Sequence, residues 1–207
     1  MVIEQIQYDD KKGWFLFRGD DHSQYCISYE CYLKIGLHIG DPVNDNLLSL
    51  LQEEDRKNRA MDLGKNFALY RPRTVKEVRD RLWREKFWEN EINNTLDWLL
   101  TKGFLDDSLY AQKYAQEKSS FHGWSKRKIF LKLREKGIDA KEIEGALSLL
   151  PEKNEKENLI LTLNKSYGRR DLKDPKEFQR VYQAMIRRGF SSDQVLSAMK
   201  QMVKKEE

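Results

Sequence analysis

Apolar residues recur along this chain in a set of six positions that is repeated three times at a spacing of about fifty residues. In each copy the spacing of the six predicts two short amphipathic helices joined by a tight turn. Such regularity is typical of a tandem structural repeat. The sets are Val78, Leu82, Phe87, Ile92, Leu96 and Leu99; Ile129, Leu133, Ile138, Ile143, Leu147 and Leu150; and Val181, Met185, Phe190, Val195, Met199 and Met202.

Polar residues between the paired helices predict how each turn is made. Gly137 and Gly189 can adopt the left-handed conformation that ends a helix, and Asp139 can cap the helix that follows the middle turn. In the first copy, Lys86 stands where the glycine is expected and Trp88 where the cap is expected. We therefore expect a looser turn in the first copy.

A further helix is expected ahead of each pair, over residues 54–70, from about 106 to 119, and over 155–167. The fold class predicted is mainly α: an elongated, solenoid-like array of three three-helix repeats, at residues 54–104, 105–151 and 152–207. A unit of about fifty residues rarely buries enough apolar surface alone, so neighbouring repeats are expected to share cores.

Residues 1–53 are expected to form a small separate module that docks onto the first repeat. Segments 2–8, 14–18 and 24–28 are rich in β-branched and aromatic residues, with turn residues between them, and predict three short strands. Ser28 is positioned to cap a short helix that ends near Gly36, and a second helix is expected to begin near Asn44.

Composition favours a soluble, cytoplasmic protein with a large surface relative to its core. Of 207 residues, 39% are hydrophobic and 35% are charged, and no apolar run approaches the roughly 20 residues that span a bilayer. The N-terminus lacks the apolar region of a signal peptide. Cys26 and Cys31 are expected to be free thiols, because a metal site needs more ligands nearby.

The charge is distributed unevenly. Residues 1–62 contain 7 Lys or Arg and 12 Asp or Glu, whereas residues 63–207 contain 31 and 22. A basic repeat surface is typical of proteins that meet phosphates or an acidic partner. The surface predicted here comprises Arg71, Arg73, Lys76, Arg79, Lys126, Arg127, Lys128, Lys132, Lys136, Arg169, Arg170, Arg187 and Arg188.

Two features of this basic surface lead to narrower expectations. Lys128, Lys132 and Lys136 recur every four residues, which predicts one ridge on the helix face opposite the apolar positions. Three tryptophans near the basic residues, Trp83, Trp88 and Trp124, can stack on bases, although packing against the core or at helix ends is favoured for each.

No motif in the sequence indicates catalysis, a cofactor or a metal. The glycine-rich phosphate loops of nucleotide-binding proteins are missing, and the three histidines lie far apart. The pairs Asp20–Asp21 and Asp106–Asp107 fall at a predicted turn and a predicted helix start, where carboxylates complement the backbone. We expect a binding protein that is not an enzyme.

Two long segments resemble the RecX family of regulators of the RecA recombinase. They are TVKEVRDRLWREKFWENEINNTLDWLLTKGFLDDSLYAQKYAQEK and GWSKRKIFLKLREKGIDAKEIEGAL, and the run LKIGLHIGDPV resembles the extra segment of longer, Gram-positive-type members. The resemblance implies a modulator without catalytic activity that lies in the groove of the RecA–DNA filament; separately, we expect a monomer. The resemblance also implies inhibition of RecA ATPase, strand exchange and coprotease activity in recombination, DNA repair and the SOS response, with weak, non-specific binding of single- and double-stranded DNA.

Two other interpretations of the sequence stay open. Paired helices joined by a tight turn also describe a helix-turn-helix protein that acts directly on duplex DNA. Against this interpretation, the second helix of the middle copy carries Asp139, Glu142 and Glu144, which suit a DNA groove poorly. The third interpretation is a pure protein scaffold, which predicts no salt-sensitive affinity for nucleic acid.

Overall fold

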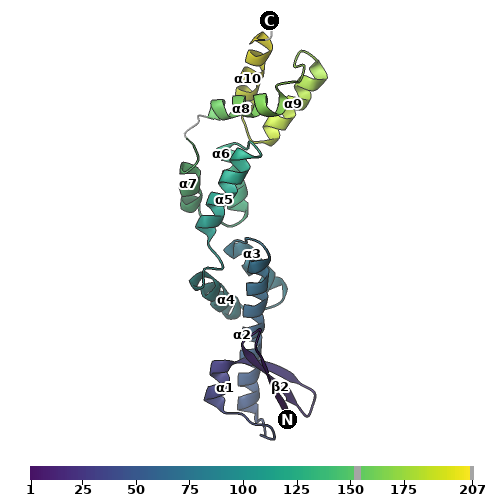
Figure 1. The fold of residues 1–207 in the computed structure, drawn as a ribbon, viewed down its shortest axis with the longest axis vertical. Coiled ribbons are helices and arrows are strands. Elements are labelled where there is room, and N and C mark those ends of the chain that lie inside the picture. Colours follow the sequence, from purple (N-terminus) through teal and green to yellow (C-terminus); the bar gives the residue numbers. More distant parts are fainter. Residues whose placement is uncertain (152–154, 206–207) are drawn as a thin grey trace. The chain divides into compact units, whose positions relative to one another are not determined.

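The computed structural model of the chain describes residues 1–151 and 155–205. It divides into two compact units, Met1–Leu105 and Asp106–Glu207, and each is treated by itself. The chain runs through three strands and then a succession of helices, as Figure 1 shows. The prediction of a mainly α fold with three three-helix repeats and a small N-terminal sheet is confirmed.

An antiparallel three-stranded sheet opens the first unit, in the order β1 (Ile3–Asp9), β2 (Trp14–Gly19) and β3 (Gln24–Ser28). Helix α1 (Tyr29–Ile35) follows at once; the Ser28 side chain caps it, and Gly36, at φ 65°, ends it as predicted. Side chains from the sheet, the next loop and the second helix form one buried cluster: Ile3, Phe17, Ile27, Leu37 and Leu51.

Helix α2 (Asp45–Tyr70) is shared between the sheet and the first repeat. Asn44 caps it as expected, but it continues unbroken where the sequence predicted two separate helices. Leu51 packs in the sheet cluster, whereas Ala60 and Ala68 pack in the first repeat. The expected module boundary at residues 53 and 54 therefore falls inside one helix, because nothing before Pro72 forces the chain to break.

The first repeat adds α3 (Val75–Arg84) and α4 (Glu89–Thr101) to the second half of α2. At the start of α3, the Thr74 hydroxyl accepts from the Glu77 backbone N–H at 3.2 Å, and the Thr74 N–H donates to the Glu77 carboxylate at 3.1 Å. This reciprocal cap satisfies two backbone donors that a helix start would otherwise leave unpaired.

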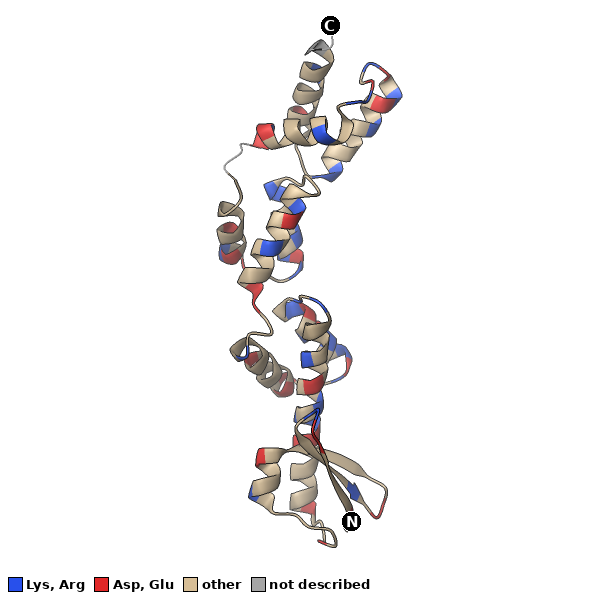
Figure 2. Ribbon diagram, viewed as in Figure 1, with Lys and Arg blue, Asp and Glu red and all other residues tan. Residues whose placement is uncertain are grey.

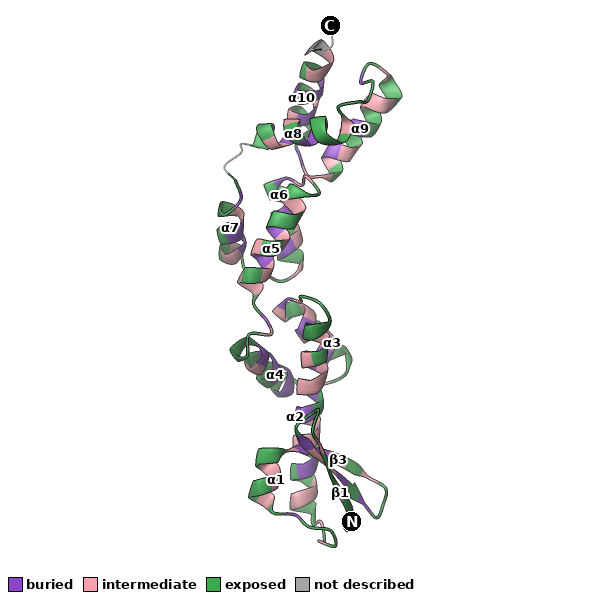
Figure 3. Cartoon of the chain, in the orientation of Figure 1, coloured by how far each residue is buried: buried purple, intermediate pink, exposed green. Residues whose placement is uncertain are grey.

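The second unit contains the other two repeats. The second repeat is α5 (Asp107–Ser120), α6 (Lys126–Glu135) and α7 (Ala140–Ser148); the third is α8 (Glu155–Tyr167), α9 (Pro175–Arg187) and α10 (Ser192–Lys205). Each has its own hydrophobic cluster, visible as the buried inner faces in Figure 3. The expectation that neighbouring repeats share a core is wrong for these two repeats, since their clusters are separate over the described residues.

The eighteen apolar positions that defined the repeat occupy equivalent places in the structure. All are buried except Phe87, Leu147 and Met202, which are partly buried and pack against the same clusters. The sixfold pattern therefore marks the inner surface of each repeat, as predicted.

The three turns between paired helices have the same conformation. Gly137 and Gly189 have φ of 87° and 90°, and Lys86 has φ of 63° in the same left-handed region. The expectation of a looser first turn is therefore wrong: burial of the flanking apolar residues holds the turn even without glycine. The next residue closes each turn with one bond, Phe87 N–H to Leu82 O (3.3 Å), Ile138 N–H to Leu133 O (3.2 Å) and Phe190 N–H to Met185 O (3.3 Å).

Both cysteines are free thiols, as expected. Burial raises the pKa of Cys26 to about 12, and the Asp55 carboxylate, which accepts from its Sγ at 2.9 Å, adds to the shift. Within residues 1–151 and 155–205, no helix has the length and apolar character needed to cross a membrane. The same residues contain no cluster of side chains suited to hold a metal ion.

Candidate interaction surface

The second and third repeats are joined by polar contacts at the turn between α9 and α10. The Ser125 N–H donates to Arg188 O at 2.9 Å, and the Ser125 hydroxyl donates to Gly189 O at 2.9 Å. The same hydroxyl caps α6 by accepting from the Lys128 N–H at 3.2 Å. Because a Cβ on Gly189 would lie 2.5 Å from Ser125 Oγ, glycine is needed for this close approach.

A second set of contacts holds the loop between α5 and α6 against the third repeat. The Arg188 guanidinium donates to His122 O at 3.1 Å and to the Tyr167 hydroxyl at 3.3 Å. Gly123, at φ 60°, packs so closely on Thr162 of α8 that a Cβ would lie 2.6 Å from the threonine methyl. Arg188 is thus a structural clamp within the unit.

A cleft of about 750 Å³ lies between this loop and α8. It is lined by three cationic side chains, Lys126, Arg127 and Lys165, and by exposed Phe121. A smaller groove of about 320 Å³ adjoins it; Arg127 lines both, and Arg187 lines the second. Phe121 and Lys165 were not singled out from the sequence, because only the packing of the third repeat brings them beside Lys126.

The thirteen predicted basic residues differ in whether their side chains form ion pairs, hydrogen bonds or ring contacts within the protein. Lys76 is exposed. Figure 2 shows basic positions in both units, including the start of α6. Among the described residues, five have exposed side chains with no ion pair, hydrogen bond or ring contact: Arg71, Lys126, Arg127, Arg169 and Arg187.

Several other predicted basic residues are bound within their own unit. Arg79 bonds to Glu89 and to Asn93, the latter at 2.7 Å, and Arg170 pairs with Glu177 at 3.0 Å. The Arg73 guanidinium lies 3.9 Å from the Phe67 ring centroid, and its Nε is buried without a hydrogen-bond partner. These groups hold α3, α4 and α9 in place and are less available to an external phosphate.

The predicted lysine ridge on α6 is only partly open to solvent. The Lys128 ammonium donates to Arg187 O and lies 3.9 Å from the Trp124 ring centroid, and burial lowers its pKa. Lys132 pairs with Glu135 at 2.6 Å, and Lys136 lies 5.4 Å from the Tyr110 ring centroid. The three lysines are therefore half-buried, with Lys128 and Lys136 against rings that pack on the second-repeat core, so they do not form the open ridge that was expected.

The three tryptophans differ in burial, which was not expected. Trp124 is partly buried in the second-repeat cluster, as expected for a residue that packs at a helix start. Trp83 and Trp88 are 63% and 65% exposed, so core packing is the wrong prediction for these two. The inward face of α3 is already filled by Val78 and Leu82, which leaves Trp83 on the outside.

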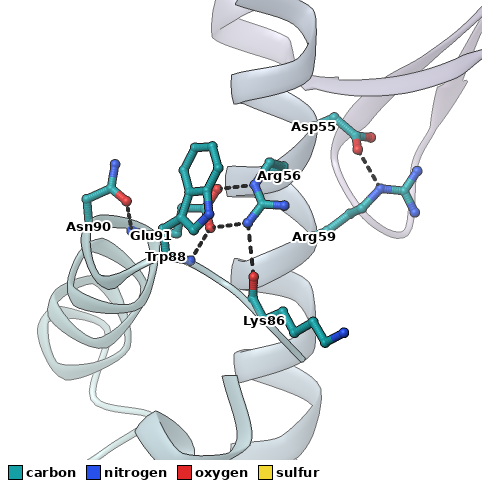
Figure 4. Close-up of polar contacts among 7 residues, drawn as sticks. All are labelled: Asp55, Arg56, Arg59, Lys86, Trp88, Asn90 and Glu91. Carbon is teal, nitrogen blue, oxygen red and sulfur yellow. Dashed lines mark hydrogen bonds and ion pairs between the residues drawn. The ribbon is translucent and has the colours of Figure 1, made fainter. Parts of the chain in front are cut away.

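Arg56 joins α2 to the turn between α3 and α4 (Figure 4). Its guanidinium donates to both oxygens of Glu91, at 2.6 and 2.8 Å, and to Lys86 O at 3.2 Å. Glu91 also accepts from the Trp88 N–H at 2.7 Å, and the guanidinium carbon lies 4.4 Å from the Trp88 ring centroid. Hydrogen bonding to Glu91 raises the pKa of Arg56, which favours the charged guanidinium.

Comparison with known proteins finds the same repeats elsewhere. Models of the second and third three-helix domains of RecX match residues 106–147 and 154–199. The chain is similar to the RecX family in these two domains. Similar RecX relatives include the regulatory protein RecX of Finegoldia magna, 28% identical and aligned over 93% of this chain and 96% of that one. The regulatory protein RecX of Clostridium botulinum is 29% identical over 96% and 94%.

Two solved RecX structures share the fold. A crystal structure of regulatory protein RecX aligns with a TM-score of 0.67 and 21% identity, over 99% of this chain and 98% of that one. RecX from Lactobacillus salivarius aligns with a TM-score of 0.56 and 24% identity, over 72% and 97%. These likenesses extend the RecX fold to nearly the whole chain, including the N-terminal sheet.

Proposed function

We propose that this chain is a non-enzymatic regulator that binds the RecA filament on DNA, in its groove, and mostly inhibits RecA. The observation that carries the proposal is the set of unpaired cations, Lys126, Arg127 and Arg187, along two adjoining clefts of a RecX-family repeat pair. Cations left without carboxylate partners are suited to phosphates or acidic protein surfaces. The activities affected are RecA ATPase, strand exchange and coprotease function in recombination, DNA repair and the SOS response.

The mechanism depends on repetition. A filament presents the same surface many times, so several weak contacts from one monomer add through effective concentration. Basic side chains release counterions from DNA and make the affinity fall with salt. They position the protein without reading base sequence. A partner assembled on chromosomal DNA implies a cytoplasmic protein.

The competing interpretations make different predictions. A helix-turn-helix protein presents its second helix to a groove, but α7 is capped by exposed Asp139 and carries exposed Glu144. That interpretation predicts preference for a selected duplex over random duplexes in a gel shift. A pure scaffold predicts no salt-sensitive binding of nucleic acid by the wild-type chain.

The test is charge reversal of Lys126, Arg127 and Arg187 to Glu in the full chain. A matched control reverses three exposed cations outside both clefts: Lys102, Lys113 and Lys176. The readouts are co-sedimentation with RecA filaments formed on single-stranded DNA with a slowly hydrolysed nucleotide, and the RecA ATPase rate.

The cleft variant is expected to bind filaments about tenfold or more weakly and to leave RecA ATPase nearly uninhibited. The control variant carries the same net charge and is expected to stay close to wild type. An equal loss of filament binding in both variants would mean that net charge, and not the clefts, accounts for the effect. If wild type did not sediment with filaments at all, the proposed partner would be wrong.

A further inference from the structure

We infer that the 750 Å³ cleft between the α5–α6 loop and α8 binds a nucleotide of single-stranded DNA, with its base stacked on Phe121 and its phosphates on Lys126, Arg127 and Lys165. This deepens the proposed function and rests on it, because it assigns a specific place to a DNA contact.

The apolar wall of the cleft is unusually open to solvent. Phe121 is 79% exposed and Leu161 of α8 is 48% exposed, and both line the cleft. Leu150 and Pro151 continue the same wall. An aromatic ring with this exposure offers a face to a base, and base–aromatic stacking does not depend on base identity.

The charged wall has the complementary chemistry. Among the described residues, Lys126, Arg127 and Lys165 form no ion pair, so their charge is available to a phosphate. Glu155, an acid in the lining, already accepts from Gln194 Nε2 at 3.4 Å. Cations beside an exposed ring suit a ligand that carries an anion and a flat apolar group together, as a nucleotide does.

The site is built in advance by packing. Gly123 presses on Thr162, and Arg188 holds His122 O and the Tyr167 hydroxyl, so the loop that carries Phe121 is fixed against α8 and α9. A preformed cleft avoids much of the entropy cost of ordering a loop on binding.

The geometry favours a single strand over other polyanions. Bases of a duplex are stacked on one another, so they cannot also stack on Phe121. Arg127 lines both this cleft and the groove that contains Arg187, which gives a phosphate backbone a path beyond one nucleotide. An acidic peptide satisfies the cations but does not require the aromatic ring.

The experiment measures binding of a fluorescent 15-nucleotide oligo-dT to the full chain by anisotropy, without RecA, across a salt series. Phe121→Ala is expected to weaken binding by about fivefold or more, the loss of one stacked base, with an unchanged salt slope. Phe121→Trp is expected to bind at least as well as wild type. Tyr70→Ala, at a ring 83% exposed in the first unit, is the matched control and is expected to be neutral.

Substitution of Lys126 and Lys165 by Gln is expected to reduce the slope of log affinity against log salt by roughly 0.7 for each phosphate that the variant no longer neutralises. The affinity for a duplex of equal length is expected to be the same for Phe121→Ala and wild type. Poly-glutamate is expected to compete for binding to the same extent with both proteins. Equal oligo-dT affinity for Phe121→Ala and wild type, or no oligo-dT binding by wild type, would overturn the site. Filament co-sedimentation is scored separately, so loss of filament binding with intact oligo-dT binding would fault only the proposed partner.

Discussion

The turn of the first repeat and the turn of the third repeat share the left-handed conformation, but different parts of the chain hold them. In the first repeat, Lys86 takes the left-handed position and Arg56 of the repeat's own leading helix holds its carbonyl. In the third, Gly189 takes that position, and Ser125 and Lys128 of the neighbouring repeat bond to the turn carbonyls.

The difference explains which turn needs glycine. Lys86 is exposed, so its side chain extends into solvent and costs only the strain of a left-handed residue, about 1 kcal/mol. At Gly189 an added Cβ would lie 2.5 Å from both Lys128 Cβ and Ser125 Oγ. Glycine in this fold is thus required where another repeat packs on the turn, whereas the turn itself is imposed by the buried residues around it.

The largest expected effect comes from Gly189→Ala. The new methyl group combines backbone strain at φ 90° with a clash against the second repeat, and we expect a loss of about 3 kcal/mol in the free energy of unfolding of the second unit. Urea unfolding followed by circular dichroism measures it. Gly36→Ala, at φ 65° with nothing within 4 Å, is the matched control and should cost about 1 kcal/mol. Equal losses at the two glycines would mean that packing on the turn contributes nothing.

An intermediate effect is expected from Arg56→Met in the first unit. The Glu91 side chain is only 9% exposed, so the substitution leaves a buried carboxylate without its cation and should cost about 2 kcal/mol. Arg59→Met is the control on the same helix: its partner Asp55 keeps the bond from the Cys26 N–H at 2.9 Å, and we expect a loss below about 1 kcal/mol.

The double variant Arg56→Met with Glu91→Gln checks the physical cause. Removing the carboxylate charge should recover part of the stability, because an amide still accepts from the Trp88 N–H and costs less to bury. A double variant less stable than Arg56→Met alone would show that the unpaired charge is not the source of the loss.

The smallest effect is expected from Lys86→Gly. Glycine relieves the left-handed strain but adds entropy to the unfolded chain, so the net gain should be about 0.5 kcal/mol in the first unit. The same urea assay measures it. A net destabilisation would contradict the expectation that left-handed strain at Lys86 outweighs the entropy that glycine adds to the unfolded chain.

The repeat architecture could be predicted from the sequence because it depends on the spacing of apolar residues along the chain. Positions such as Val78, Ile129 and Val181 recur about every fifty residues, at steps of 51 and 52, and each proves fully buried. Caps at Ser28, Asn44 and Asp106 were also predictable, since a capping side chain bonds to backbone within three residues of itself. The interaction surface was harder to predict. Lys128 and Arg188 donate hydrogen bonds to carbonyls about sixty residues away in the chain, and no local pattern indicates such contacts.

The amino-acid sequence alone determined the three helical repeats, their inner faces and most helix ends, because periodicity and local hydrogen bonding act over a few residues. Only the tertiary structure decided that α2 is one helix shared with the sheet, that the second and third repeats keep separate cores, and that Phe121 and Lys165 line one cleft with Lys126. These features arise from packing between residues distant in the chain, and no local pattern in the sequence specifies which distant surface a side chain will meet.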